Sequence, residues 1–271
     1  MKKVLEHCRP AIAIAKMLVE DLRIRDASEI EIDLIAAHLG LHVIFKPLAN
    51  EEGHLVRNGA GGLIVVNDAA RDTAKWRWVI AHEIGHFRQH RGADQFEACT
   101  DRDIHTWYVK SGVEAQANAF AAELLMPEIL FKHRCEISRP SLTQIGELAS
   151  AFQTSLSATA LRFIAFSPEP CAVAHSTSGE IDWWASTDDF GFTLKKGFKL
   201  SNKTYAGDLF DGRSAPRQPL TVDGESWSDD SRAGARDVYE HSVLLGRFGS
   251  TLSLLSHAYE DPEEDEVDSD E

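Results

Sequence analysis

The sequence has few cysteines and no long apolar run. Four cysteines occur among its 271 residues, and no two of them form a C-x-x-C pair: Cys8, Cys99, Cys135 and Cys171. This spacing argues against a zinc knuckle and a disulfide framework, and it fits a reducing cytoplasm. No segment approaches the roughly 18 apolar residues that cross a bilayer. The start, MKKVLEHCRP, has no apolar stretch after its lysines, so we expect no secretory signal, no membrane contact and a cytoplasmic location.

Basic residues are also scarce. The chain has 28 Lys and Arg against 43 Asp and Glu, a net charge of −15. Nine of the acids and no base lie in the last twelve residues, EDPEEDEVDSDE (260–271), which offer a single apolar side chain. We expect this tail to be disordered, and it serves to solvate the chain, to attract a basic partner or to mimic DNA. The acidic balance argues against direct binding to duplex DNA.

One motif carries the chemistry. His82-Glu83-Ile84-Gly85-His86 is an H-E-x-x-H sequence within a helical pattern, Asp72 to His90. Residues four apart lie on one helix face, so both imidazoles point at the same spot and can hold one Zn²⁺. Glu83 is then placed to take a proton from water at the metal. The pattern predicts a zinc site with a general base beside it.

The surroundings of the motif support the helix. Asp72 or Asn67 can cap its start, and Gly92 can end it. Gly85 lowers helix propensity by about 1 kcal/mol, which is understandable if another backbone approaches closely there. An apolar stripe at helical spacing should face the core: Trp76, Ile80, Ile84 and Phe87.

A second helical pattern runs from Gly112 to Pro127 and offers a third ligand. Glu114 and Asn118 are four apart and share a face. Glu114 could reach the zinc, and Asn118 could hold the outer ring nitrogen of a zinc-bound histidine, or both could be solvated. The spacing places Glu123 on the exposed surface, without a role.

Two other histidines compete as the third ligand. His90 lies one turn beyond His86 on the same face, but a straight helix rarely aims three successive turns at one ion. His105 lies in an expected loop and is a weaker candidate. The residue that stabilises an oxyanion cannot be read from the pattern; Tyr108 and His105 are the available guesses.

Three segments together resemble the ImmA/IrrE family of zinc metallopeptidases: GLIVVN (62–67), RWVIAHEIGHFRQH (77–90) and EAQANAFAAELLMP (114–127). The resemblance covers roughly residues 28–165. It implies that His82 and His86 bind zinc, that Glu83 is the general base and that Glu114 is the third ligand, as in thermolysin-like peptidases. Asn118 stands where Asp is commoner, which weakens the charge on that contact but keeps an acceptor.

The resemblance also implies a biological role. The family suggests an intracellular endopeptidase that cuts a helix-turn-helix repressor and thereby switches on stress or mobile-element genes. Two alternatives remain: a regulatory module that binds its partner without cutting it, and a toxin–antitoxin component. Glu83 argues against both, because a purely structural metal site has no use for an acid beside the open coordination position. Oligomeric state, substrate and trigger stay open.

The expected fold class is α+β. A zincin-like metallopeptidase domain (1–137) combines a small sheet with the active-site helices. A helix-turn-helix-like segment (138–167) follows, then a β-rich domain (168–259) that is sensory in some family members, and the acidic tail. In 138–167 the second helix has Arg162 as its only base, so we interpret the segment as a packed helical pair and not as a DNA reader.

Several local elements are also predicted. Ser28 to Glu31 reads as a capping box that opens a helix through Leu39, and LHVIFKPL (41–48) reads as a strand. LIVVN (63–67) is either an edge strand that holds extended substrate by main-chain hydrogen bonds, or a buried central strand. Two hairpins are expected in the β-rich domain, over 171–186 and 240–259.

Overall fold

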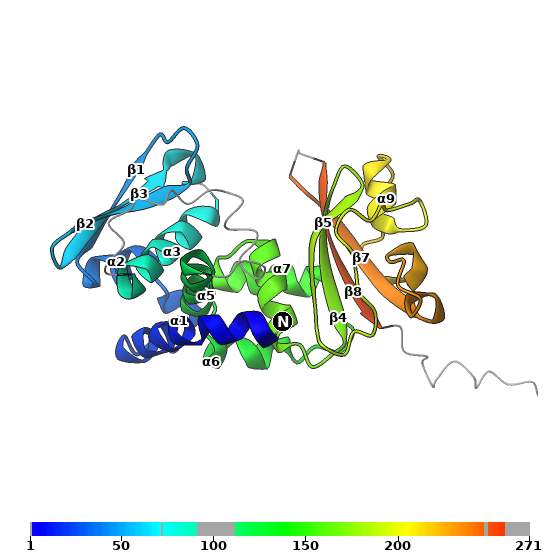
Figure 1. Cartoon of the computed structure of the whole chain (residues 1–271), viewed down its shortest axis with the longest axis horizontal. Helices are drawn as coiled ribbons and strands as arrows, with labels where there is room; N and C mark the ends of the chain where they lie inside the picture. The colour runs from blue at the N-terminus through cyan, green and yellow to red at the C-terminus, as the bar shows by residue number, and fades with distance from the viewer. Residues whose placement is uncertain (1, 72, 91–111, 247–248, 258–271) are drawn as a thin grey trace, which may run out of the picture. The chain divides into compact units, whose positions relative to one another are not determined.

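The structure, a computed structural model, describes residues 2–71, 73–90, 112–246 and 249–257. The chain divides into two compact units, which Figure 1 shows. Among the described helices, none is both long and apolar enough to cross a bilayer.

The first unit comprises residues 1–138 and 143–168 and mixes helices with a small sheet. This mixed α+β composition agrees with the expected class. Its strands are β1 (Leu41–Lys46), β2 (Gly53–Asn58) and β3 (Gly61–Asn67). Its α-helices are α1 (Lys2–Asp21), α2 (Ile32–His38), α3 (Lys75–Gln89), α5 (Val113–Leu125), α6 (Glu128–Phe131), α7 (Leu142–Phe152) and α8 (Leu156–Phe166).

β3 is the central strand of the small sheet. It pairs in parallel with β1 and antiparallel with β2, in the order β1-β3-β2. The prediction of an edge strand at LIVVN is therefore wrong, and the alternative of a central strand is right. The physical reason is that the backbone groups of β3 pair on both sides, with β1 and with β2, so no edge is left for a substrate; Ile64, Val65 and Val66 are also buried.

α3 lies between the sheet and α5, as Figure 1 shows. The sheet approaches it closely at Gly53 of β2, where a Cβ would come within 2.4 Å of the Val79 side chain. On α3, Ile80 and Ile84 of the predicted stripe are buried, and Trp76 and Phe87 are half-buried. The helix carrying the histidines is thus held by packing on two sides.

Two predicted helix caps are wrong. Ser28 and Glu31 form no capping box, because Asp26 and Glu29 have the same spacing and form one on the 3-10 turn Ala27–Glu29. The Ser28 hydroxyl donates to Asp26 at 2.7 Å, and α2 begins only at Ile32.

The start of α3 also differs from the prediction. Asn67 caps the turn Asp68–Ala70 by accepting the N–H of Ala69 at 3.2 Å, whereas α3 begins at Lys75 without a side-chain cap at Ala74. The other two predicted boundary residues, Asp72 and Gly92, lie outside the described residues.

α5 is buried nearly all round, since it packs against both α1 and α3. The prediction that Glu123 is exposed is wrong: only 2% of the residue is accessible. Its carboxylate pairs with Arg162 of α8 and accepts the N–H of Glu128 at 3.0 Å. Helical spacing distinguishes an exposed face only where a helix has one, and this turn of α5 has none.

The guanidinium group of Arg162 makes its hydrogen bonds and its ion pair inside the protein. Its Nε and Nη2 donate to the carbonyl of Met126 at 3.1 and 2.8 Å, beyond the ion pair with Glu123. Two helices, α7 and α8, occupy the segment predicted to be a helical pair, and Ser155 caps α8 by accepting the N–H of Ala158. The one base of the second helix is therefore not available to a phosphate.

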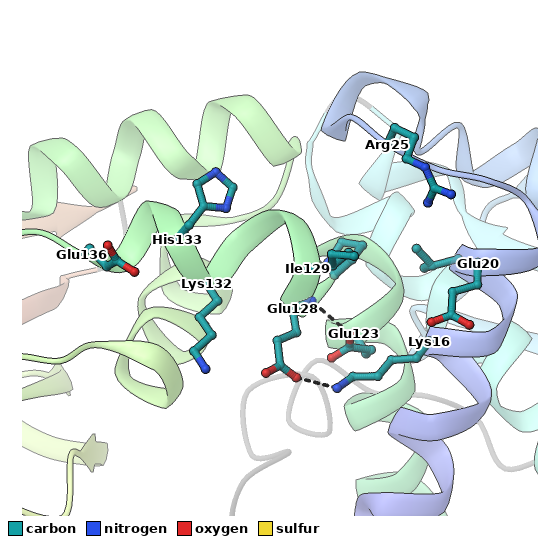
Figure 2. A pocket seen from close by; sticks show the side chains of 11 residues that line it. Lys16, Glu20, Arg25, Glu123, Glu128, Ile129, Lys132, His133 and Glu136 are labelled. Atoms are coloured by element: carbon teal, nitrogen blue, oxygen red, sulfur yellow. Dashed lines mark hydrogen bonds and ion pairs between the residues drawn. The ribbon is translucent and has the colours of Figure 1, made fainter.

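A pocket of about 470 Å³ opens beside this buried pair. Figure 2 shows Glu123 close to Glu128 and the ion pair between Lys16 of α1 and Glu128 of α6. Acidic and basic side chains both line it: Lys16, Glu20, Arg25, Glu128, Lys132 and Glu136. The pocket thus presents charged side chains of both signs.

The second unit comprises residues 139–142 and 169–271 and contains a five-stranded antiparallel sheet in the order β5-β4-β8-β7-β6. Strands occupy both regions predicted to be hairpins. The strands are β4 (Cys171–Thr177), β5 (Glu180–Ser186), β6 (Leu220–Asp223), β7 (Asp237–Leu245) and β8 (Ser250–His257).

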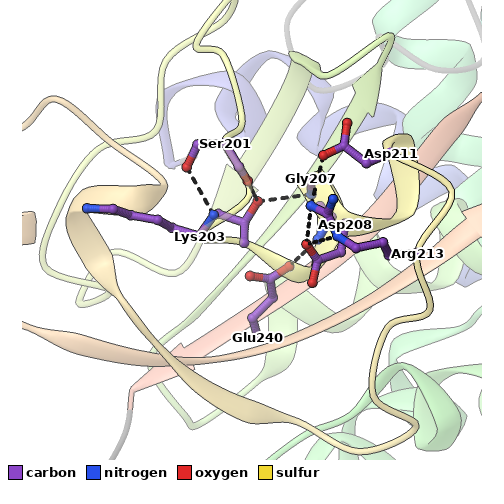
Figure 3. Close-up of polar contacts among 9 residues, drawn as sticks. Ser201, Lys203, Gly207, Asp208, Asp211, Arg213 and Glu240 are labelled. Carbon is purple, nitrogen blue, oxygen red and sulfur yellow. Dashed lines mark hydrogen bonds and ion pairs between the residues drawn. The ribbon is translucent and has the colours of Figure 1, made fainter.

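Glu240 of β7 is fully buried in this unit and ties α9 (Tyr205–Phe210) to the sheet (Figure 3). Its carboxylate accepts from the N–H of Ala206 at 2.7 Å, from Trp227 Nε1 at 2.9 Å and from the Ser242 hydroxyl at 2.6 Å. Burial raises the pKa of Glu240, partly offset by these donors. A buried carboxylate satisfied by several donors is typical of a structural anchor.

Candidate metal centre

α3 and α5 approach each other closely at Gly85. A Cβ at this position would lie 3.1 Å from the Cα of Ala117, 3.2 Å from its carbonyl oxygen and 3.2 Å from the Cβ of Phe120. The absence of a side chain lets the two helices touch backbone to backbone, as expected from the sequence. This contact sets the first turn of α5 beside the histidines of α3.

Three potential ligand groups lie together between these helices. The Nε2 atoms of His82 and His86 are 2.9 Å apart. The carboxylate oxygens of Glu114 lie 3.1 Å from His82 Nε2 and 3.3 Å from His86 Nε2. These three residues form a group that could hold a metal ion, the only such group found among the described residues.

The outer contact of His82 indicates which of its nitrogens carries the proton. Asn118 Oδ1 lies 2.8 Å from His82 Nδ1, inside a fully buried environment. An amide oxygen only accepts, so Nδ1 donates and Nε2 of the neutral ring offers a bare lone pair toward Glu114. Asn118 thus lies against the outer edge of the His82 ring.

Glu114 is the negative member of the group. Burial alone would raise the pKa of its carboxyl, but the neighbouring His82 and His86 outweigh burial, and the pKa lies below its ordinary value. Neither carboxylate oxygen has a hydrogen-bond partner among the described residues. Two imidazole nitrogens and an ionised carboxylate that converge on one spot are a donor set suited to a divalent cation, so the residues fit a metal ion.

Glu83 is buried, with 2% of its surface accessible, and its Oε1 has no hydrogen-bond partner within the described part of the chain. Burial, countered in part by His86 and reinforced by Glu114, raises the pKa of Glu83 to about 7. A buried acid whose pKa lies near neutrality is suited to accept and release a proton.

In metal-free protein, Glu83 should therefore cost stability as the pH rises. The pKa of Glu83 in the folded protein, about 7, exceeds the ordinary value of 4.5. Its contribution to the free energy of unfolding is therefore fully present below about pH 4.5 and is lost as the pH rises through 7. Glu83→Gln should match wild type in unfolding free energy near pH 4 and exceed it by at most about 3 kcal/mol at pH 8. Denaturant melts in chelator across this range measure the difference; equal curves at every pH would contradict the burial argument.

His90 ends α3 and does not join the three-residue group. Its Nδ1 lies 3.1 Å from Nδ1 of His86, on the far side of that ring from Glu114. Burial lowers the pKa of His90, partly offset by a contact with Gln116. His105 and Tyr108, the other candidates named from the sequence, lie outside the described residues.

Two residues near the group carried no sequence signal. Gln116 Oε1 lies 3.1 Å from His90 Nε2, and Arg57 of β2 donates to the carbonyls of His86 and Phe87 at 2.6 and 3.2 Å. Gln116 lies off the face shared by Glu114 and Asn118, and Arg57 is distant in sequence. Neither a periodicity nor a motif could have identified them.

Within this α+β unit, two histidines and a glutamate that could hold a metal ion converge between two helices. Residues 36–163 match the model of the peptidase M78 family, described as the IrrE N-terminal-like domain. These residues form a domain of the ImmA/IrrE family, as the sequence resemblance implied.

Two known proteins show how far the similarity extends. The radiation response metalloprotease IrrE of Deinococcus radiodurans is 29% identical over 169 residues, which cover 60% of this chain and 49% of that protein. The chain thus spans about half the length of this curated relative. A solved structure, a Mycobacterium tuberculosis transcriptional regulator, superposes with a TM-score of 0.58 over 92% of this chain and 76% of that one, at 13% identity. The second similarity concerns the fold alone.

Proposed function

We propose that this chain is a zinc-dependent endopeptidase with a zincin-like catalytic domain of the gluzincin type. The observation that carries the proposal is the convergence of His82, His86 and Glu114 with a buried Glu83 beside them. Two imidazoles and one carboxylate are a donor set that zinc takes in peptidases, where a fourth position stays open.

In this proposal each residue has a distinct task. His82, His86 and Glu114 hold the ion, and Asn118 keeps His82 in the tautomer that can bind it. Bound zinc supplies Lewis acidity toward water and a peptide carbonyl. Glu83 accepts the proton of the attacking water and delivers it to the leaving amine nitrogen. The raised pKa of Glu83 suits both transfers.

We further propose that the substrate is a helix-turn-helix repressor, cut in the cytoplasm to derepress stress or mobile-element genes. Family membership supports this, together with the description of the Deinococcus relative as a radiation response metalloprotease. Direct DNA binding is not part of the proposal, since Arg162, the only base of α8, is buried in contacts with Glu123 and Met126.

Co-expression with the small regulator encoded nearest to it tests the proposal. We expect intact-mass measurement to show two new fragments of the regulator whose masses sum to the parent plus one water. Cleavage should stop in chelator and return with zinc. A regulator that binds the zinc-loaded protein but keeps its full mass would favour the non-cleaving module; a neighbouring toxin that forms the complex instead would favour the toxin–antitoxin alternative.

A further inference from the structure

His86 lacks a partner of the kind that Asn118 provides for His82. The outer nitrogen of His82 meets an amide oxygen directly, which settles its tautomer. The outer nitrogen of His86 meets another imidazole, that of His90, at 3.1 Å. An imidazole nitrogen can donate or accept, so this contact alone leaves the tautomer of His86 undetermined.

Gln116 resolves the ambiguity. Its Oε1 lies 3.1 Å from His90 Nε2, while its Nε2 donates to the backbone carbonyl of His7 in α1 at 3.3 Å. The carbonyl of His7 only accepts, so the amide of Gln116 must turn its NH₂ group toward α1 and its oxygen toward His90. The oxygen in turn requires a proton on His90 Nε2.

The proton positions then follow in sequence. A neutral His90 with a proton on Nε2 has a bare Nδ1, which accepts from Nδ1 of His86. His86 therefore carries its proton on Nδ1 and leaves Nε2 bare, 2.9 Å from Nε2 of His82 and 3.3 Å from Glu114. This is the only arrangement in which both histidines of the three-residue group present lone pairs to a metal.

The backbone of His90 is fixed as well. Arg57 Nη2 donates to the carbonyl of His86 at 2.6 Å and reaches that of His90 at 3.4 Å, which holds the last turn of α3. The His90 ring is thus positioned by its backbone on one side and by Gln116 on the other. Both anchors come from elements outside α3, namely β2 and α5.

We infer that His90 and Gln116 are positioning residues that hold His86 in its metal-binding tautomer through a hydrogen-bonded chain from α1 to the metal centre. This rests on the metal centre of the proposed function and does not depend on which substrate is cut. His90 thereby has a role that differs from the third-ligand alternative raised by its spacing.

Zinc affinity of the full-length chain tests this, measured by competition with a chromophoric chelator. Wild type should bind one zinc and His82→Ala should lose it. His90→Phe, which keeps the ring shape without an acceptor, should weaken binding by ~10–100-fold, and Gln116→Leu by ~10-fold. Gln116→Glu still offers an acceptor and should stay within ~3-fold of wild type.

Gln89→Leu is the matched control. Gln89 adjoins His90, but among the described residues it donates to the carbonyl of Gly85 in its own helix and not to the histidines, so its loss should leave zinc affinity unchanged. A second readout does not involve the metal: imidazole ¹⁵N NMR of the metal-free protein should show His86 with its proton on Nδ1 in wild type and a mixture of tautomers in Gln116→Leu.

The outcomes separate the two ideas. If the wild-type protein binds no zinc, both the proposed metal centre and the positioning role of His90 and Gln116 are wrong. If wild type binds zinc and His82→Ala does not, while His90→Phe and Gln116→Leu bind like wild type with an unchanged His86 tautomer, only the positioning role is wrong. Weakening by Gln116→Leu, rescue by Gln116→Glu and a shifted tautomer would establish it.

Discussion

Glu83→Gln is expected to lower cleavage of the true substrate by ~10²–10⁴-fold, the usual contribution of general-base catalysis. The amide is nearly the same size as the carboxylate but cannot accept the proton of the attacking water. Glu83 is not one of the three grouped ligand residues, and its Oε1 has no partner among the described residues to lose. Zinc content and fold should therefore survive the substitution.

Time courses of fragment formation by intact mass, with equal zinc content in both proteins, measure this effect. Partner binding should persist, so the variant should hold the uncut substrate and can be used to isolate it. In cells it should fail to induce the controlled genes at normal protein levels. Induction equal to wild type would show that the protein acts by binding, and the hydrolytic proposal would be wrong.

Arg162→Met is expected to destabilise the first unit by ~3–5 kcal/mol, the usual cost of leaving one partner of a buried ion pair uncompensated. The substitution leaves the buried carboxylate of Glu123, of which 2% is accessible, without its cationic partner. It also removes both donors to the carbonyl of Met126. Met126 follows the end of α5, the helix that carries Glu114. The loss should also reduce zinc retention as α5 loosens.

Denaturant unfolding measures this loss of stability, and two further variants serve as comparisons. Replacing both partners, Glu123→Leu with Arg162→Met, should restore much of the stability, because no unpaired charge then remains. Lys16→Met breaks the half-exposed pair with Glu128 and should cost only ~0–1 kcal/mol. An Arg162→Met protein within about 1 kcal/mol of wild type would show that Glu123 finds water or protonates at little cost.

Sequence periodicity was sufficient wherever the relevant interactions are local. The four-residue spacing of His82 and His86 places both rings on one face of α3, and the same spacing relates Glu114 to Asn118 on α5. Gly85 also signalled the close approach of a second backbone, because a glycine within a helix is costly without such a reason. These features depend on helix geometry, which residues close in sequence determine.

Tertiary structure decided what depends on neighbours distant in sequence. The strand LIVVN is recognisable from its residues, but only pairing with β1 on its other side makes it central. Glu123 appears exposed by spacing, yet α8 brings Arg162 against it. His90 and Gln116 come together from α3 and α5, 26 residues apart, and only their meeting sets the proton on His86. Such contacts follow from how helices pack, and packing is not encoded in any single helix's periodicity.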